Sequence, residues 1–151
     1  ALEKMTWGSW HPHKVKLAVS GCPRNCAEAT IKDYGVVATE AGWDLHVGGN
    51  GGIKVRATEL LCKVTTEAEV LEYCGAFLQL YRQEARYLER TAPWIERVGL
   101  KYVQERIVDD AQNRAALYEK FLYAQRFAQI DPWAQEAATN QTSYLPLAEL
   151  V

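Results

Sequence analysis

The sequence predicts an α+β fold, in which a small mixed or antiparallel sheet with a cysteine-bearing helix precedes a mostly helical C-terminal half. Two observations lead to this prediction. Between residues 14 and 64, short β-branched runs alternate with glycine-containing stretches, a pattern typical of strands and turns. Between residues 66 and 128, apolar residues recur every three or four positions among charged ones, as in amphipathic helices.

The first half is predicted to run strand, helix, strand, turn, strand. Apolar alternation over residues 15–19 indicates the first strand. Pro23 suits the first turn of a short helix that ends near residue 32, because the N–H that proline lacks would have no intrahelical partner there. Residues 34–39 and 43–47 are predicted to pair as a hairpin.

Three helices are predicted in the second half. The first begins with a capping box, in which Thr66 and Glu69 satisfy each other's backbone N–H groups. The second begins with Thr91 as its N-cap and is interrupted or joined to another helix at Gly99, and the last begins at residues 109–110. The predicted apolar face of the first helix is Val70, Cys74, Phe77, Tyr81, Ala85 and Leu88, and that of the last is Leu117, Phe121, Ala124 and Phe127.

Composition and pattern suggest one core with three consecutive parts. Residues 1–64 hold the sheet, 65–130 form a helical extension packed on it, and 131–151 form a loosely ordered tail. The 151 residues are 48% hydrophobic, which is enough for a core. The net charge of −2 implies no broad attraction to nucleic acid or membrane, and no apolar run approaches the roughly 18 residues of a membrane span. We expect neither as a partner.

Two of the four cysteines, Cys22 and Cys26, are candidates for metal ligation. They lie at a predicted helix start, where unpaired N–H groups and the helix dipole favour thiolates. Ordinary buried thiols are the alternative, because a C-x3-C spacing alone is a weak signal. Cys62 and Cys74 lie among aliphatic residues and are predicted to be core side chains. The irregular spacing suits a reducing compartment, which predicts a cytoplasmic protein.

The glycine-rich stretch at residues 48–52 is not a phosphate loop, since no lysine or serine closes it. It permits close backbone approach to a large flat cofactor, and a flexible turn is the alternative. Lys54 and Arg56 then alternate with Ile53 and Val55 and would project from one strand face. That face would meet either cofactor carboxylates or solvent.

Residues 15–30, which include the C-x3-C pair, closely resemble the second cysteine pair of the siroheme and iron–sulfur region of assimilatory nitrite and sulfite reductases. Residues 33–37 and 45–52 continue the resemblance in the expected order. Within this family the chain is most similar to the large subunits of NAD(P)H-dependent nitrite reductases. The similarity covers most of the chain and is strongest over residues 14–64 and 90–98.

The resemblance implies that two cysteine pairs bind a 4Fe-4S cluster and that Cys22 and Cys26 are the second pair. It also implies that Cys26 is the axial ligand that joins the cluster to the siroheme iron. Between the two cysteines, Arg24 and Asn25 could donate N–H groups to cluster sulfides or siroheme carboxylates, and a solvated loop is the alternative. The other residues predicted to bind the cofactor are Gly49, Asn50, Lys54 and Arg56.

The upstream cysteine pair of the family is absent, since none of the 21 residues before Cys22 is a cysteine. We therefore expect a C-terminal fragment of a longer subunit, which alone binds neither cluster nor siroheme. We expect it to contain no catalytic residue, because the basic residues that bind the substrate in this family lie upstream.

For the intact protein, the resemblance implies six-electron reduction of nitrite to ammonium, with electrons from NAD(P)H passing through FAD on upstream domains. Its implied partners are those domains and a small nitrite reductase subunit. A sulfite reductase with the same cofactors is one alternative. A non-catalytic docking module, with its cysteines free or on zinc, is the other, although zinc sites usually use two close cysteine pairs.

Overall fold

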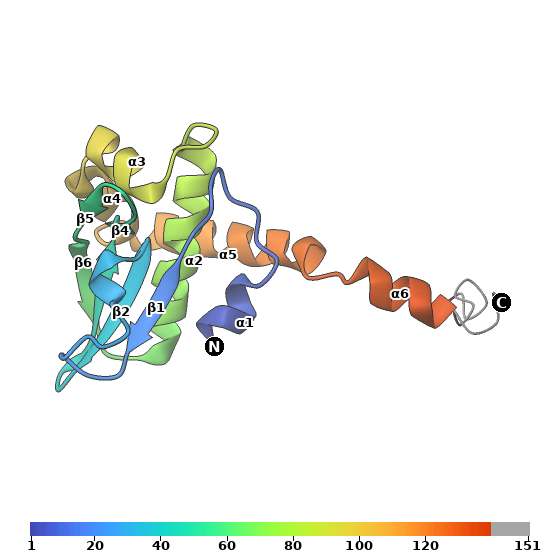
Figure 1. Ribbon diagram of the computed structural model, residues 1–151, viewed down its shortest axis with the longest axis horizontal. Coiled ribbons are helices and arrows are strands. Elements are labelled where there is room, and N and C mark those ends of the chain that lie inside the picture. Colours follow the sequence, from blue (N-terminus) through green and yellow to red (C-terminus); the bar gives the residue numbers. More distant parts are fainter. Residues whose placement is uncertain (140–151) are drawn as a thin grey trace.

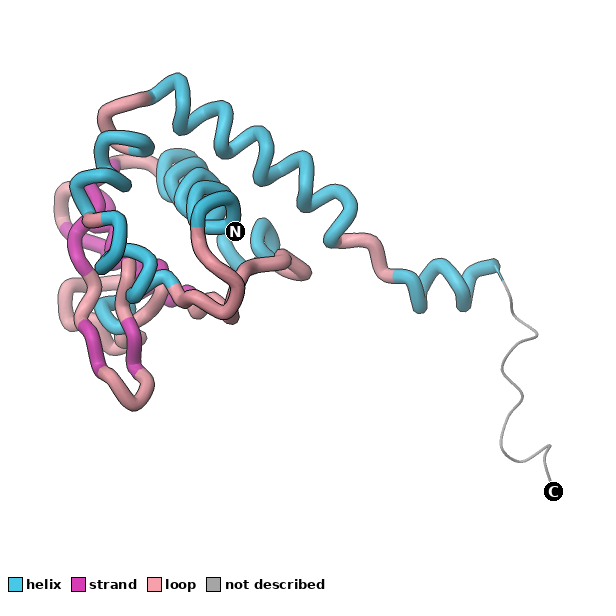
Figure 2. Tube along the Cα trace, turned by 90° about the horizontal axis from the view of Figure 1, so that it is seen from above, coloured by secondary structure: helices cyan, strands magenta, loops and turns pink. Residues whose placement is uncertain are grey.

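Helix α2 forms the middle layer of the computed structural model, with a four-stranded sheet on one side and helix α5 on the other (Figure 1, Figure 2). The structure describes residues 1–139. The elements are, in chain order, α1 (Leu2–Thr6), β1 (Leu17–Ser20), the 3-10 helix η1 (Ala29–Ile31), β2 (Tyr34–Thr39), β3 (Gly42–Val47), β4 (Asn50–Gly51), β5 (Val55–Arg56), β6 (Glu59–Val64), α2 (Glu67–Glu84), α3 (Thr91–Val98), α4 (Leu100–Ile107), α5 (Ala111–Ala128) and α6 (Pro132–Thr139).

The sheet has the order β1-β2-β3-β6, with β1 parallel to β2 and the other neighbours antiparallel. The predicted hairpin is confirmed, because β2 and β3 pair from Tyr34 opposite Val47 to Thr39 opposite Gly42. β4 and β5 form a separate two-stranded ribbon. The predicted α+β class with a small mixed sheet is therefore confirmed. None of the helices in the described part of the chain is both long and apolar enough to cross a membrane.

Both sides of α2 are buried, because the sheet packs on one side and α5 on the other. On the sheet side, the ring centroids of Tyr34 and Phe77 lie 5.9 Å apart. On the other side, Gly75 lets α5 approach so closely that a Cβ atom there would lie 2.5 Å from the Tyr118 ring. Such interdigitation between layers is what makes a core resist changes of side-chain volume.

Three predicted helix boundaries are confirmed. The Thr66 hydroxyl accepts a hydrogen bond from the Glu69 N–H, and the Glu69 carboxylate accepts one from the Thr66 N–H, which completes the capping box. Gly99, with φ +87°, separates α3 from α4. The Asp110 carboxylate caps α5 by accepting a hydrogen bond from the Asn113 N–H.

The helix predicted from Pro23 to about residue 32 is wrong, because turns and the short η1 take its place. Asn25 and Glu28 have φ values of +53° and +55°, in the left-handed region that an α-helix does not contain. The Asn25 Oδ1 also accepts the Ala29 N–H at 2.7 Å, a local bond that competes with a helical one. A loop rather than a helix therefore follows β1.

Other expectations on the helical half are also corrected. Thr91 is the first residue of α3 and not its N-cap, since its hydroxyl donates to the Asp33 carboxylate. Leu88 and Phe127 are 60% and 61% exposed, so neither belongs to a buried face. Regular structure continues after Asp131 as α6, and the rest of the predicted tail, residues 140–151, lies outside the described residues.

One hydrophobic core joins the sheet half and the helical half. It includes Leu45 and Val47 from β3, Leu78 from α2, Trp94 from α3 and Phe121 from α5. The two halves therefore fold as one unit, and the boundary predicted between residues 64 and 65 stays a prediction about the longer protein.

A buried carboxylate connects the start of β2 with the starts of β1 and α3. Asp33 is 0% exposed, and its Oδ2 accepts hydrogen bonds from the Lys16 backbone N–H at 2.8 Å and the Arg90 guanidinium at 2.6 Å. Its Oδ1 accepts the Thr91 hydroxyl. A buried charge is tolerated only with such a set of donors. The Asp33 carboxylate therefore holds the starts of β1, β2 and α3 together in space.

His11 lies between α1 and β1, in a cleft of about 400 Å³ whose walls include Ser9, Lys14 and Leu78. Burial, together with the positive charge of the nearby Arg82 guanidinium, lowers the pKa of His11 from 6.5 to about 4. His11 is therefore neutral in the folded protein at neutral pH.

We expect the fold to form without metal, because its core lies away from the exposed cysteines. Thermal unfolding followed by circular dichroism should be cooperative, with the same midpoint with and without a chelator. A midpoint that falls on chelation would instead indicate a structural metal.

Replacing Asp33 by Asn should lower the free energy of unfolding by about 3–5 kcal/mol, because Arg90 then loses its buried ionic partner. The matched control is Asp44→Asn, which removes the partner of the largely exposed Lys63 and should cost less than about 1 kcal/mol. Urea unfolding of both variants measures the difference, and equal losses would contradict the central role of Asp33.

The depressed pKa of His11 predicts that stability is present above pH 6.5 and is lost as the pH falls toward 4, because the unfolded chain takes up the proton first. Between about pH 7.5 and about pH 4.5, the wild type should lose roughly 2 kcal/mol more unfolding free energy than His11→Gln. Parallel pH profiles for the two proteins would show that His11 is not buried in its neutral form.

Candidate functional site

Cys22 and Cys26 lie on the loop that leaves the end of β1, and both thiols are exposed and free. Two turns shape this loop: the Asn25 N–H donates to the Cys22 carbonyl at 3.1 Å, and the Glu28 N–H donates to the Asn25 carbonyl at 2.9 Å. Two free, exposed thiols on one short loop are a donor pair suited to a soft metal ion or an iron–sulfur cluster.

Asn25 holds this loop from inside. Its Oδ1 accepts the Ser20 hydroxyl at 3.0 Å and the Ala29 N–H at 2.7 Å, and its Nδ2 donates to the Thr30 hydroxyl at 2.6 Å. The Asn25 side chain is thus turned into the loop, where it positions the two cysteines, and the cofactor-binding role of Asn25 stays a prediction.

The environment of the thiols also differs from the prediction. No α-helix begins at Cys22, so no helix dipole acts on the two sulfur atoms. Arg24, between the cysteines, is exposed and forms no ion pair within residues 1–139. It is the nearest cation in sequence to both thiols, and its cofactor-binding role stays a prediction.

The other two cysteines are unsuited to ligation. Cys74 is fully buried, as predicted, and burial raises the pKa of its thiol well above its usual range. Cys62 is half-buried, and burial raises the pKa of its thiol to about 11. Both therefore stay protonated at neutral pH, whereas thiolates are the metal-binding form.

The glycine-rich loop leaves the sheet at the end opposite the cysteine loop (Figure 1). The cysteine loop begins after Ser20, which pairs with Val37, whereas Gly48 follows Val47, which pairs with Tyr34. From Tyr34 to Val37, three residue steps of β2 separate these two sheet positions by about 10 Å. The residues that the sequence assigned to one cofactor site thus lie toward two ends of the sheet.

Gly49 is buried against its own chain. A Cβ atom there would lie 2.6 Å from the Lys32 carbonyl oxygen, which accepts the Gly49 N–H at 2.9 Å. The absence of a side chain at Gly49 permits this contact, and the prediction that Gly49 forms a cofactor edge stays a prediction.

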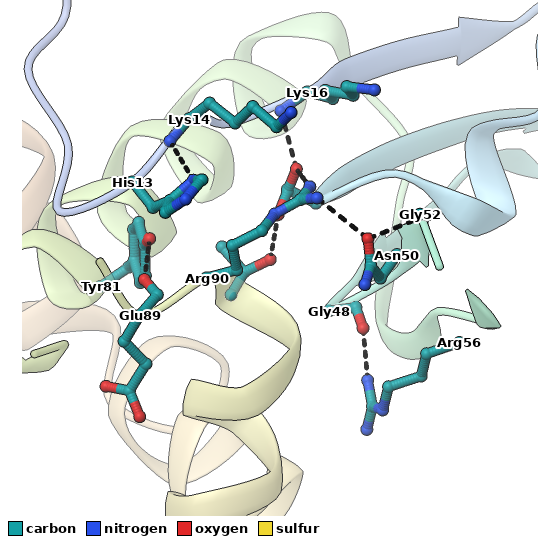
Figure 3. Close-up of polar contacts among 12 residues, drawn as sticks. His13, Lys14, Lys16, Gly48, Asn50, Gly52, Arg56, Tyr81, Glu89 and Arg90 are labelled. Carbon is teal, nitrogen blue, oxygen red and sulfur yellow. Dashed lines mark hydrogen bonds and ion pairs between the residues drawn. The ribbon is translucent and has the colours of Figure 1, made fainter. Parts of the chain in front are cut away.

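Asn50 and Arg56 are also occupied by internal contacts (Figure 3). The Asn50 Oδ1 accepts a hydrogen bond from the Arg90 guanidinium at 2.9 Å, which joins Asn50 to the Asp33 cluster, and its predicted contact with a cofactor stays a prediction. Arg56 donates to a backbone carbonyl and forms ion pairs with Glu59 at 2.5 Å and Glu96 at 3.3 Å. Its charge is thus balanced by two carboxylates of the chain, and its predicted role as a cation for siroheme stays a prediction.

Lys54 differs from Arg56. It is exposed at the turn between β4 and β5 and forms no ion pair with any described residue. Its ammonium group stays a candidate for binding an anionic group outside this chain.

The sequence analysis missed the Asp33 cluster. Asp33 and Arg90 each begin a segment in which the family resemblance is strong, but they are 57 positions apart. Residue type and spacing do not show that such distant residues pair. Without a known partner, a charged side chain such as that of Asp33 or Arg90 is expected at the surface.

Within residues 1–139, no group of three or more His, Cys, Asp or Glu side chains is placed to hold a metal ion. Cys22 and Cys26 are thus a partial ligand set. Their softness, exposure and freedom from other contacts fit half of a four-thiolate cluster site, and the remaining thiolates must come from outside the described residues.

A model of the nitrite and sulphite reductase 4Fe-4S domain family matches residues 1–114. The chain is 53% identical to a Bacillus subtilis nitrite reductase [NAD(P)H], over 95% of this chain and 18% of the relative. It is 39% identical to the large subunit of an Escherichia coli NADH nitrite reductase, over 91% of this chain and 16% of the relative. It is also 32% identical to an assimilatory-type sulfite reductase of Nitratidesulfovibrio vulgaris, over 72% of this chain and 50% of the relative.

The chain therefore spans less than a fifth of the length of these two nitrite reductases. The family match covers the sheet, the cysteine loop and helices α2 to α4, which are the parts that the Asp33 cluster and the core hold together. On this evidence, the chain belongs to the nitrite and sulphite reductase 4Fe-4S domain family.

Proposed function

We propose that this chain is the part of a siroheme- and 4Fe-4S-containing nitrite reductase large subunit that supplies the second cysteine pair of the cluster. The observation that carries the proposal is the loop with the exposed thiols of Cys22 and Cys26, which Asn25 holds from inside. Cys62 and Cys74, whose pKa values are raised by burial, are not ligands.

The names of the relatives support nitrite as the substrate and NAD(P)H as the electron donor of the intact protein. When bound, the cluster and siroheme supply the chemistry of a six-electron reduction of nitrite to ammonium. We place FAD and the NAD(P)H site on upstream domains of the same subunit. We also expect a small subunit as partner, because the Escherichia coli relative is called a large subunit. Four free cysteines favour a cytoplasmic location.

Within the intact protein, Cys22 and Cys26 would hold the cluster as thiolates, and Cys26 would also be the contact of this chain with siroheme. Arg24 and Lys54 are the exposed cations left to pair with anionic groups, at opposite ends of the sheet. The loop itself contributes position: its internal hydrogen bonds hold the two cysteines before any ligand binds, which lowers the ordering cost of ligation.

Reduction of sulfite is the second candidate within the same class, because an assimilatory-type sulfite reductase is also similar to this chain. Comparing nitrite and sulfite as substrates of the intact protein distinguishes the two. A docking or metal-binding module without catalysis is the alternative of another class, and it predicts zinc or no metal in the intact protein.

In the intact subunit, Cys26→Ser should abolish nitrite reduction, because it removes the thiolate assigned to both cofactors. Reduction of flavin by NAD(P)H should persist, since the flavin lies in a separate domain. Turnover per siroheme and the rate of flavin bleaching measure these two effects separately.

The matched control is Cys62→Ser. It should cost roughly 1–3 kcal/mol of stability, for a hydroxyl left poorly paired in a half-buried position, while turnover per folded molecule is retained. Loss of the cluster in Cys62→Ser, with the cluster kept in Cys26→Ser, would refute the ligand assignment.

A further inference from the structure

Strand β1 forms one edge of the four-stranded sheet, on the side where α1 lies (Figure 1). The direction of its backbone groups follows from Lys16, the residue before it. The Lys16 N–H donates to the Asp33 carboxylate at 2.8 Å, and the Lys16 carbonyl accepts the Tyr34 N–H at 3.3 Å. Both backbone groups of Lys16 therefore point toward β2.

In a β-strand, the backbone groups of successive residues point alternately to the two sides of the strand. Ala18 and Ser20 therefore share the direction of Lys16 and pair with β2, whereas the N–H and carbonyl groups of Leu17 and Val19 point outward. Within residues 1–139, nothing forms a hydrogen bond with these outward groups. Beyond β1 there is thus a place for one more strand.

The opposite edge of the sheet, β6, is protected against such pairing. The Gln104 Nε2 in α4 donates to the Leu61 carbonyl at 3.0 Å, β6 carries the charged Glu59 and Lys63, and its pairing with β3 contains a register shift. Charges, irregular pairing and a covering helix are the usual means by which an edge strand avoids a new partner. By contrast, β1 has no charged residue and pairs with β2 in continuous register, which is the character of an interior strand.

Two hollows lie along the free side of β1. One, of about 360 Å³, lies between β1 and α1, and its walls include Leu2, Leu17 and Val19. The other, of about 420 Å³, has walls that include Val19, Val36 and Val70. Val19 borders both hollows and is 47% exposed. A strand beside β1 would cover Val19 and fill the hollows with apolar side chains, which removes apolar surface from water.

The order of the sheet indicates where such a strand comes from. Strands β1, β2 and β3 are neighbours in the sheet in the same order as in the chain. Since consecutive strands are usually neighbours, the place beyond β1 suits the strand that precedes β1 in the chain. Helix α1 supplies the connection, because it contacts α2 and its Leu2 belongs to the core. A helix packed on the sheet between two strands is the arrangement of a strand–helix–strand unit.

We propose that a strand from the part of the subunit that precedes residue 1 pairs with the free edge of β1 and extends this sheet. The inference rests on the proposed function, in which the chain is part of a longer subunit, and the chain covers only 18% of the Bacillus subtilis relative. The added strand exchanges hydrogen bonds with Leu17 and Val19. Its side chains toward α1 are apolar, because they meet Leu2 and Val19.

The pairing also bears on the cysteine loop. β1 ends at Ser20 and leads directly into the loop that carries Cys22 and Cys26. A strand held along β1 therefore fixes the position of this loop relative to the preceding part of the subunit, from which the proposed function takes the other two thiolates of the cluster.

Hydrogen exchange measured at single amides tests the proposal on this chain and on the intact subunit. In this chain, the Leu17 and Val19 amides should exchange at nearly the rate of an unstructured peptide, because neither has an acceptor. In the intact subunit, both should exchange about a hundredfold more slowly, since a paired strand must open before its amides exchange. The Ala18 amide, which faces β2, is the matched control and should be slow in both proteins.

Fast exchange of Leu17 and Val19 in the intact subunit would overturn the proposal, and the proposed function would stand if that subunit holds siroheme and cluster. Slow exchange in a subunit without either cofactor would support the strand and contradict the proposed function. Slow exchange in this chain alone, increasing with its concentration, would assign the edge to a second copy. Protection that requires a separate small subunit would assign the edge to that partner. Either of these last two results would overturn the proposal.

Proline variants test the same pairing through stability. Val19→Pro removes an outward N–H, which an edge strand tolerates, so in this chain it should lower the melting temperature no more than Val19→Ala does. In the intact subunit it should lower the melting temperature more than Val19→Ala, because the lost N–H then belongs to a hydrogen-bonded pair. Ala18→Pro removes an N–H that points to β2 and should lower the melting temperature of both proteins. If Val19→Pro and Val19→Ala were equivalent in the intact subunit as well, the added strand would be contradicted.

Discussion

The buried carboxylate of Asp33 is the contact on which the arrangement of the other segments depends. It lies at the start of β2 and accepts hydrogen bonds from the backbone before β1, from Arg90, and from Thr91 at the start of α3. Arg90 then reaches Asn50 in the glycine-rich loop. One ionised group in the interior thus determines how two strands, a loop and a helix meet. Its desolvation is compensated by three donors, the Lys16 backbone N–H, the Arg90 guanidinium and the Thr91 hydroxyl.

The Asp33 cluster and the cysteine loop occupy opposite ends of the sheet, and this separation explains their different character. At the Asp33 end, polar side chains are turned inward, and Gly49, Asn50 and Arg56 serve contacts within the chain. At the other end, Asn25 holds a loop whose two thiols face outward without a partner. The first end stabilises the fold, while the second offers donors to a ligand that lies outside this chain.

The elements predicted from periodicity and capping were found because their signals are local. The hairpin of residues 34–47, the Thr66–Glu69 capping box and the break at Gly99 each depend on residues close in sequence. The helix after Pro23 was wrong because one side chain, Asn25, replaces the helical hydrogen bonds, which apolar spacing does not reveal. For the site, the resemblance identified Cys22 and Cys26 as a ligand pair, and the structure adds that both are exposed. The resemblance could not show that Asn50 is paired with Arg90 or Arg56 with Glu96, because each pair is about 40 residues apart in the sequence.

The central claim is that the exposed pair, Cys22 and Cys26, is half of an iron–sulfur ligand set and not a pair of unengaged surface thiols. Analysis of the intact subunit for iron, acid-labile sulfide and the siroheme absorption band, in wild type and in Cys22→Ala, tests it most directly. The account predicts iron, sulfide and the siroheme band in the wild type, and loss of the cluster iron and sulfide in the variant. Zinc or no metal in the wild type, or an unchanged iron and sulfide content in Cys22→Ala, would contradict it.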